Sequence, residues 1–202
     1  MNAFKPVALL LAGLLAACAS SSTAPVLITL PPAAMPLSAV PAVAGTPGST
    51  PLLVVRRVGI PEYLVARRVR YRADTSTLAE WPNTFWAERI EIGVTREFVS
   101  ALQQQLPGWL VCDTSCGNQV PGLTLQVDMV PMDYVRGAQK LQARARITLS
   151  GGALTQNVLK TQELAYEVPA GADTPQAQAQ AMTELLRRTA AATAPLVLGA
   201  KP

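Results

Sequence analysis

Histidine is absent from the sequence, and only 3 of its 202 residues are cysteines. Without histidine the chain cannot form the Ser-His and Cys-His pairs that activate many nucleophilic enzymes. The glycines at 151 and 152 lack the residues that would complete a phosphate loop or a dinucleotide fingerprint. Asp128 and Asp133, on either side of Pro131, are expected to be surface acids. We therefore expect no catalytic residues and no cofactor, although folding can bring together carboxylates that are distant in sequence.

Charged residues and long apolar runs are also scarce. Charged side chains make up 15% of the residues and aromatic ones 5%, and the net charge is only +4. No aromatic-and-basic pattern resembles a nucleic-acid module, so we expect no nucleic-acid partner. The apolar run from Val7 to Leu15 is shorter than the roughly 20 residues that a membrane-spanning helix needs. It is therefore not expected to remain as a transmembrane helix.

This run has the layout of a secretory signal. Lys5 supplies a positive charge before it, and small residues follow it. Its end, Leu15-Ala16-Ala17-Cys18, resembles the bacterial lipobox, in which the cysteine thiol is acylated and the peptidase cuts before that cysteine. We expect residues 1–17 to be a lipoprotein signal peptide, Cys18 to be the lipid attachment site, and residues 18–25 to be a lipidated tether. The alternative is a chance cysteine at the end of an ordinary signal peptide.

The residue after Cys18 predicts where the protein goes. Lipoproteins retained in the inner membrane commonly carry Asp at this position, whereas this chain has Ala19. By resemblance to that sorting rule, we expect a lipid-anchored protein on the periplasmic face of the outer membrane. Two acyl chains already anchor a protein stably, because each buried methylene contributes about 0.8 kcal/mol.

Lipidation of Cys18 would leave an even number of cysteines, Cys112 and Cys116. In an oxidising periplasm we expect these two to form a disulfide that closes a tight loop. A metal site is the alternative, but there is no histidine and no second cysteine pair to supply ligands. The disulfide is therefore favoured, and no metal is expected.

Residues 26–198 are expected to form one domain, since this length suits a single core. Alternating or β-branched apolar patterns predict strands at 26–30, 52–55, 67–72, 123–129, 141–149 and 164–168. Between the first two, residues 31–51 are rich in Pro and Ala and carry no charge. We expect this segment to be a loop outside the core.

Two helices complete the pattern. Apolar residues recur every four positions up to Leu106, which predicts a helix from about Thr84 to Leu106. A second helix is expected to start at Asp173-Thr174-Pro175, with the proline at its first helical position, and to run towards a break at Pro195. The last three strands are consecutive and predict a meander. This order favours an α+β fold, a two-layer sandwich in which a mostly antiparallel sheet carries two main helices on one face.

The predicted strand at 67–72 alternates three arginines, Arg68, Arg70 and Arg72, with apolar residues. A strand places these arginines on one face. One interpretation is a solvated face of an edge strand. The other is an electrostatic contact with a partner or with lipid phosphates, which the guanidinium fork matches. The sequence does not choose between them.

Several short motifs resemble those of one known family. They are Pro61-Glu62-Tyr63-Leu64, the arginine strand, Phe85-Trp86-Ala87-Glu88 at the expected start of a helix, Leu125-Gln126-Val127-Asp128 and Leu141-Gln142-Ala143-Arg144. With the order of elements from Val26 to Leu198, they are similar to the ABC-type transport auxiliary lipoprotein family. The long loop at 31–51, the cysteine pair and the few tyrosines of the first strand depart from the family pattern.

The resemblance implies a docking function. Such lipoproteins are similar to outer-membrane partners of periplasmic mammalian-cell-entry-type (MCE) proteins, which move lipids between membranes together with an ABC ATPase and a permease. We therefore expect a non-catalytic component that Cys18 anchors and whose surface receives an MCE protein, with a homo-oligomeric ring as one arrangement. Arg68, Arg70 and Arg72 are the predicted contact with that partner.

Two other functions suit a lipid-tethered α+β domain. One is an accessory lipoprotein that activates a cell-wall enzyme or acts in secretion assembly. The other is a carrier that shields lipid, which needs an apolar cavity instead of a filled core.

Overall fold

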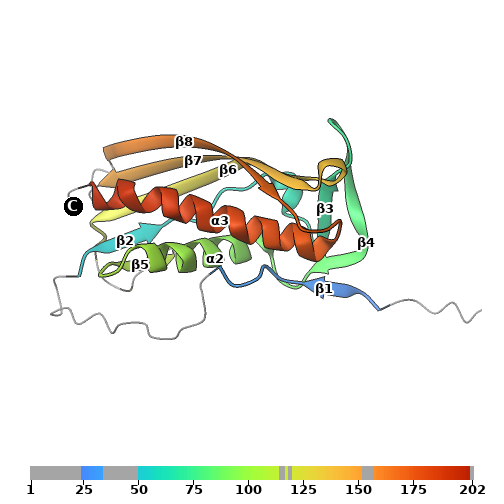
Figure 1. The fold of residues 1–202 in the computed structure, drawn as a ribbon. Coiled ribbons are helices and arrows are strands. Elements are labelled where there is room, and N and C mark those ends of the chain that lie inside the picture. Colours follow the sequence, from blue (N-terminus) through green and yellow to red (C-terminus); the bar gives the residue numbers. More distant parts are fainter. Residues whose placement is uncertain (1–23, 34–49, 114–116, 118–119, 152–156, 201–202) are drawn as a thin grey trace, which may run out of the picture.

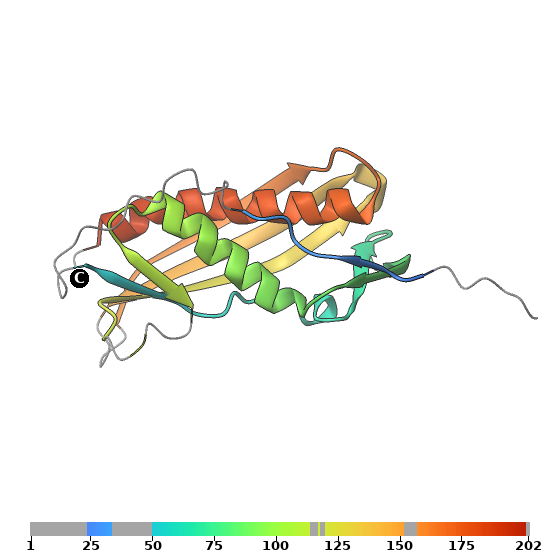
Figure 2. The ribbon, with the colours of Figure 1, turned by 90° about the horizontal axis from the view of Figure 1, so that it is seen from below.

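The computed structural model describes residues 24–33, 50–113, 117, 120–151 and 157–200. Its strands are β1 (Val26–Ile28), β2 (Leu52–Val55), β3 (Arg68–Arg72), β4 (Leu78–Trp86), β5 (Leu110–Asp113), β6 (Leu123–Val135), β7 (Lys140–Gly151) and β8 (Asn157–Pro169). Its helices are α2 (Ile90–Gln105) and α3 (Pro175–Leu198), with short 3-10 turns η2 (Glu62–Leu64) and η3 (Arg136–Ala138). The two long helices pack against each other on one face of the sheet (Figure 1 and Figure 2). The predicted α+β class with two main helices is confirmed.

The sheet is mixed, so the prediction of a mostly antiparallel sheet is wrong. Its strand order is β1-β4-β3-β6-β2-β5, with β7 paired to the long β6 and β8 paired to β7. Four pairings are parallel, β1 with β4, β2 with β5, β2 with β6, and β3 with β6. The alternation within a strand shows which side chains share a face, but it does not show the direction of the neighbouring strand. The connection between β2 and β5 contains β3, β4 and α2, and this length lets β5 run parallel to β2.

The meander of β6, β7 and β8 is antiparallel, as predicted. The chain turns between β6 and β7 through η3, where Gln139 has a positive φ of 47°. β6 is longer than the predicted strand at 123–129, because it continues past Pro131 through a bulge between Met129 and Met132. A bulge is one of the few places where a strand accommodates proline.

The predicted start of the first helix is wrong. Residues Thr84 to Trp86 belong to β4, and α2 begins only at Ile90. Trp86 pairs with Ile28 of β1, and both side chains are buried. Trp86 fitted the four-residue spacing because buried strand residues and buried helix residues are both apolar. The motif Phe85-Trp86-Ala87-Glu88 is therefore the end of a strand followed by a bend.

The second helix starts as predicted and ends later than predicted. Thr174 caps α3 by accepting a hydrogen bond from the backbone N–H of Ala177 at 3.1 Å. The helix does not break at Pro195 but continues to Leu198. Pro195 is exposed while Val197 is completely buried, so packing of the last turn holds the helix together beyond the proline.

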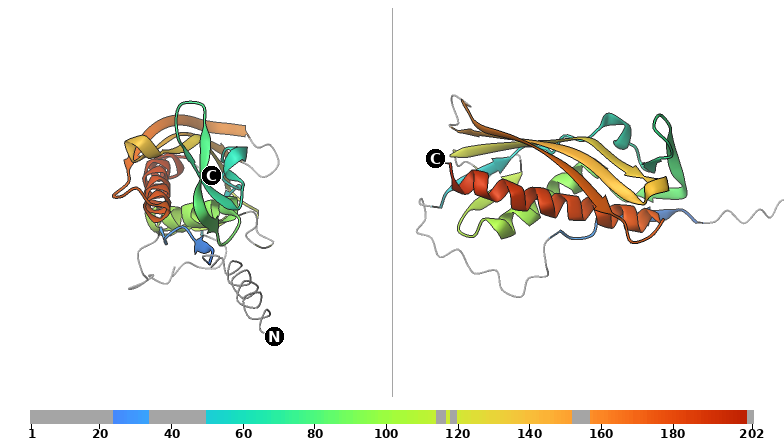
Figure 3. Two further views of the ribbon diagram at one scale, coloured as in Figure 1. Left: turned by 90° about the vertical axis from the view of Figure 1, so that its right-hand side faces the viewer. Right: turned by 45° about the horizontal axis from the view of Figure 1, so that its top comes forward.

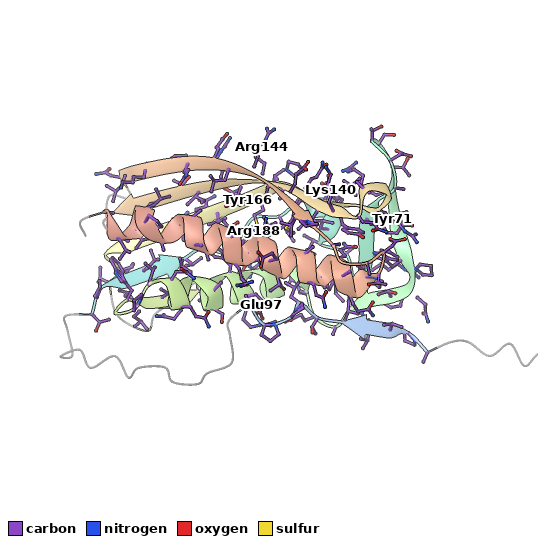
Figure 4. The ribbon with its side chains drawn as sticks, viewed as in Figure 1. Tyr71, Glu97, Lys140, Arg144, Tyr166 and Arg188 are labelled. Carbon is purple, nitrogen blue, oxygen red and sulfur yellow. The ribbon has the colours of Figure 1, made fainter. Side chains whose placement is uncertain are left out.

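Ala33 in the predicted loop at 31–51 lies in the core, which corrects at this residue the prediction that the loop stays outside it. Ala33 is 3% exposed, and its backbone N–H donates to Oε2 of the buried Glu97 on α2 at 2.8 Å (Figure 4). The hydroxyl of Thr183 on α3 donates to the backbone oxygen of Pro31 at 3.0 Å. Buried polar groups on the helices thus pair with this stretch of backbone. Residues 34–49 lie outside the described residues.

A bidentate ion pair stabilises the start of α2 and predicts an acid-dependent stability. Arg96 donates to both carboxylate oxygens of Glu88, at 2.6 and 2.8 Å, which lowers the pKa of Glu88. The stabilisation is therefore complete above the unfolded-state pKa of about 4.3 and is lost as the pH falls through the lower folded-state pKa. We expect Glu88→Gln to lose about 0.5–1 kcal/mol at neutral pH, because the pair is partly exposed, and to lose none near pH 2.

Urea unfolding at neutral and acidic pH measures this difference. Glu163→Gln is the matched control, because Glu163 pairs with Arg146 in a more exposed position. Equal pH dependence of unfolding in the wild type and in Glu88→Gln would contradict the assignment.

Candidate functional site

The arginine strand β3 lies beside β4 at one end of the molecule (Figure 3). Arg68 Nε lies 3.3 Å from Glu80 Oε2, and Arg70 Nη2 lies 3.2 Å from Glu80 Oε1. Arg70 also donates to the backbone oxygen of Tyr63 at 2.9 Å. Glu80 on β4 thus balances part of the charge of two of the three predicted contact arginines.

The third arginine belongs to a partly buried triad with Asp133 and Tyr63. Arg72 Nε donates to Asp133 Oδ2 at 2.8 Å, and the phenol of Tyr63 donates to Asp133 Oδ1 at 2.8 Å. Burial raises the pKa of Tyr63, and the hydrogen bond and negative charge of Asp133 raise it further. Asp133 is only 8% exposed, so the prediction that it is a surface acid is wrong. Its partners come from η2 and β3, which the linear sequence does not connect to it.

We expect Asp133→Asn to lower the pKa of Tyr63 and to destabilise the domain. Without the carboxylate, no negative charge opposes formation of the phenolate, although burial still keeps the pKa above its ordinary value. Removing the partner of Arg72 costs about 1–3 kcal/mol. Absorbance titration of the phenolates, with Tyr63→Phe as the reference that identifies this tyrosine, measures the pKa. Urea unfolding measures the stability.

The matched control is Glu80→Gln, whose carboxylate is more exposed and is expected to contribute at most about 1 kcal/mol. A Tyr63 titration that is the same in Asp133→Asn and in the wild type would contradict the triad.

Arg136, in the turn η3 before β7, also lies at this end. Its guanidinium carbon lies 4.9 Å from the ring centre of Tyr71 and 4.4 Å from that of Trp81, which permits cation–π attraction. It also donates to the hydroxyl of Tyr71 at 2.8 Å and pairs with Asp173 at 3.0 Å. Figure 4 shows Tyr71 at this end. No sequence signal could have found the cluster, since Tyr71 and Arg136 are 65 residues apart.

Trp81 connects the cluster to α3. Its indole Nε1 donates to Gln178 Oε1 at 2.7 Å, and Gln178 Nε2 donates to the backbone oxygen of Arg70 at 2.7 Å. Both side chains are buried, Trp81 at 5% exposure and Gln178 at 2%. A satisfied buried amide thus links β3 and β4 to the helix layer and holds the arginine strand in a defined position.

The three predicted contact arginines are not equally available. The side chains of Arg70 and Arg72 are 32% and 22% exposed, whereas that of Arg68 is 49% exposed. Arg70 and Arg72 therefore contribute to the stability of this end through their ion pairs. Contact of the three arginines with a partner stays a prediction.

The cysteines lie mostly outside the described residues. Cys112 lies on β5 and is disulfide-bonded. Cys116, the predicted partner, and Cys18, the predicted lipid attachment site, are not among the described residues. The pairing of Cys112 with Cys116 and the lipidation of Cys18 stay predictions.

The described residues contain neither a candidate metal site nor a candidate membrane-spanning helix. Within them, no three His, Cys, Asp or Glu side chains are placed to hold a metal ion. No helix in the described part of the chain combines the length and the apolar character needed to span a membrane. A hollow of about 330 Å³ lies over β7 and β8 beside Arg144 and Glu167, and one of about 290 Å³ lies beside Trp86 and Glu91.

The space between the sheet and the helices is filled by a hydrophobic core. Its fully buried members include Phe98 and Leu102 of α2, Ile147 of β7, and Leu185 and Leu186 of α3. A filled core differs from the apolar cavity that a lipid carrier needs.

The family model for ABC-type transport auxiliary lipoprotein components matches residues 31–194. This span begins just after β1 and includes the rest of the sheet and most of α3. The chain therefore belongs to the ABC-type transport auxiliary lipoprotein family, and the resemblance seen in the sequence motifs is confirmed.

Two curated relatives carry the same name. The intermembrane transport lipoprotein PqiC of Escherichia coli strain K12 is 30% identical over 76 residues, which are 38% of this chain and 41% of the relative. PqiC of Shigella flexneri matches with the same values. The match thus spans less than half the length of these relatives.

Two solved structures share the fold. One is the crystal structure of an uncharacterised protein, with a TM-score of 0.69 and 18% identity, covering 87% of this chain and 99% of that protein. The other is a protein from Xanthomonas campestris, with a TM-score of 0.62 and 15% identity, covering 87% of this chain and 95% of that protein. At these identities they support the fold and not a function.

Proposed function

We propose that this protein is a non-catalytic outer-membrane lipoprotein that docks a periplasmic MCE-type protein of an ABC-type lipid transport system. The observation that carries the proposal is the family match over residues 31–194. The name of the relative PqiC, an intermembrane transport lipoprotein, supports the part of the proposal that concerns transport between membranes. In this role, ATP hydrolysis belongs to other subunits, and this chain supplies a membrane-bound surface.

The predicted anchor supports this role. The lipobox ending in Cys18 tethers the domain, and Ala19 in place of Asp directs it to the outer membrane. A docking component must stay at its membrane while the partner approaches from the periplasm. Acyl chains on Cys18 provide this lasting attachment to the membrane, because each buried methylene contributes about 0.8 kcal/mol.

The packed interior supports docking over carriage of lipid. The side chains between the sheet and the helices are buried in a continuous cluster, so a lipid acyl chain would have to displace them. A receiving surface needs a rigid domain, and the bridge from Trp81 through Gln178 to β3 is one source of that rigidity. Assembly of several copies into a ring is part of the proposal, and mass photometry of the detergent-extracted protein tests it.

Affinity purification from crosslinked envelopes tests the docking role. A tagged, lipidated full-length chain is expected to recover an MCE subunit, identified by mass spectrometry. An unrelated outer-membrane lipoprotein with the same tag is the control for proteins that only share the membrane. Recovery of a cell-wall synthase or of secretion subunits, with no MCE subunit, would contradict the proposal.

A further inference from the structure

An exposed row of side chains crosses β1, β4 and β3. Leu27 is paired with Phe85, and Phe85 is paired with Arg68. Directly opposite residues of neighbouring strands point to the same side of a sheet. Leu27 is 55% exposed and the side chain of Arg68 is 49% exposed. Because the alternate residue Trp86 is buried, this row faces away from the core.

The row combines cations with apolar side chains. The guanidinium carbons of Arg68 and Arg67 lie 5.0 and 6.0 Å from the ring centre of Phe85. We call Leu27, Arg67, Arg68 and Phe85 the tether face. Arginines that pair with phosphates, beside apolar side chains at the headgroup boundary, suit the surface of an anionic bilayer.

The route of the chain places the tether face near the anchor. Asn83 Nδ2 donates to the backbone oxygen of Ala24 at 2.9 Å, which holds the start of the domain beside β4 (Figure 1). Ala24 follows Cys18 by six residues. Six residues span at most about 20 Å even when fully extended. A lipid on Cys18 therefore keeps Ala24 within that distance of the membrane surface, and Leu27 follows Ala24 by three residues.

We propose that the tether face lies against the phospholipid headgroups of the membrane that holds the anchor, with Arg67 and Arg68 on lipid phosphates. The proposal rests on the lipid anchor of the proposed function. It assigns Arg68 to lipid and not to the transport partner, because a protein docking here would have to enter the narrow gap between the domain and the bilayer. The outer face of β7, which carries Arg144 on the side of the molecule away from β1, then faces the periplasm (Figure 4).

Fluorescence quenching in vesicles tests this orientation. The lipidated full-length chain is reconstituted in vesicles of phosphatidylethanolamine and phosphatidylglycerol that carry a headgroup-attached quencher. Leu27→Cys and, as the matched position, Val158→Cys on β8, which is 63% exposed, each receive a fluorophore. The parent chain, treated in the same way and not reduced, gives the background from its own cysteines. Quenching at position 27 and none at position 158 is the expected result.

Charge variants test the role of the arginines. Each basic residue at an anionic surface strengthens the association about fivefold. Arg67→Glu with Arg68→Glu is therefore expected to lower the ratio of docked to undocked domains by roughly twentyfold or more, seen as loss of quenching at position 27. Arg144→Glu with Arg146→Glu is the matched control and is expected to leave the quenching unchanged. High salt is expected to weaken the quenching in the wild type.

Flotation of the vesicles separates the two proposals. Protein that does not float with the vesicles lacks the anchor, and this result would overturn the proposed function as well. Protein that floats but shows equal quenching at positions 27 and 158 overturns the tether face alone. Crosslinking of position 27 to a periplasmic protein in intact envelopes would assign the face to a protein partner and would also overturn the lipid contact.

Discussion

Replacing Cys18 with serine is expected to remove the protein from the outer-membrane fraction, because serine has no thiol to acylate and the lipoprotein peptidase then leaves residues 1–17 attached. In the proposed function the acyl chains on this one sulfur attach the protein to the membrane. Two acyl chains of ordinary length contribute a binding free energy far above the thermal energy, because each buried methylene adds about 0.8 kcal/mol. Membrane fractionation and mass spectrometry of the mature N-terminus measure the effect.

The control variant keeps the lipid on Cys18 and changes the membrane to which the protein is sorted. Ala19→Asp is expected to leave Cys18 acylated and to retain the protein in the inner membrane. Mass spectrometry of the wild-type protein that finds the Cys18 sulfur bare, or residues 1–17 still attached, would contradict the anchor and with it the proposed docking role.

Trp81→Ala is expected to cause the largest loss of stability at the arginine strand, about 3–5 kcal/mol. The indole is 5% exposed, and its ring centre lies 4.9 Å from that of Tyr71. The substitution leaves a cavity, removes the hydrogen bond to Gln178 and takes away one ring beneath Arg136. Urea unfolding of the soluble domain measures the loss, and amide hydrogen exchange is expected to rise in β3 and β4.

Two variants separate the contributions to this effect. Trp81→Phe keeps much of the apolar contact but leaves the buried Gln178 without its indole donor, at a cost of about 1–3 kcal/mol. Val158→Ala, at an exposed position of β8, is expected to stay within about 0.5 kcal/mol of the wild type. A Trp81→Ala protein as stable as Val158→Ala would show that the bridge between β3 and α3 does not support this end.

Elements whose signals are local could be predicted from the sequence. Thr174 followed by Pro175 marked the start of α3, because a hydroxyl cap and a proline in the first turn both suit the same helix end. The alternating residues at 123–129 and 141–149 predicted two neighbouring strands of a meander, and the structure pairs β6 with β7. The prediction that α3 ends at Pro195 was wrong, because the sequence does not show that burial of Val197 holds the following turn.

The end of the molecule that carries the arginine strand was only partly predictable. The alternation at 67–72 identified Arg68, Arg70 and Arg72 as residues of one strand face. The sequence could not show that Glu80 and Asp133 neutralise them in part, or that Arg136 lies on Tyr71 and Trp81. These partners come from separate elements, and ion pairs between distant residues leave no periodic pattern.

The sequence by itself determined the expected lipid attachment at Cys18, the family motifs, and most of the helices and strands, because each of these depends on neighbouring residues and short spacings. Only the tertiary structure decided that the sheet is mixed, that Trp86 belongs to a strand, and that Asp133 is buried beside an arginine. It also decided that Arg68 is the most exposed of the three predicted contact arginines. Strand direction, burial and charge pairing depend on which distant segments meet, and that is settled when the chain packs into one core.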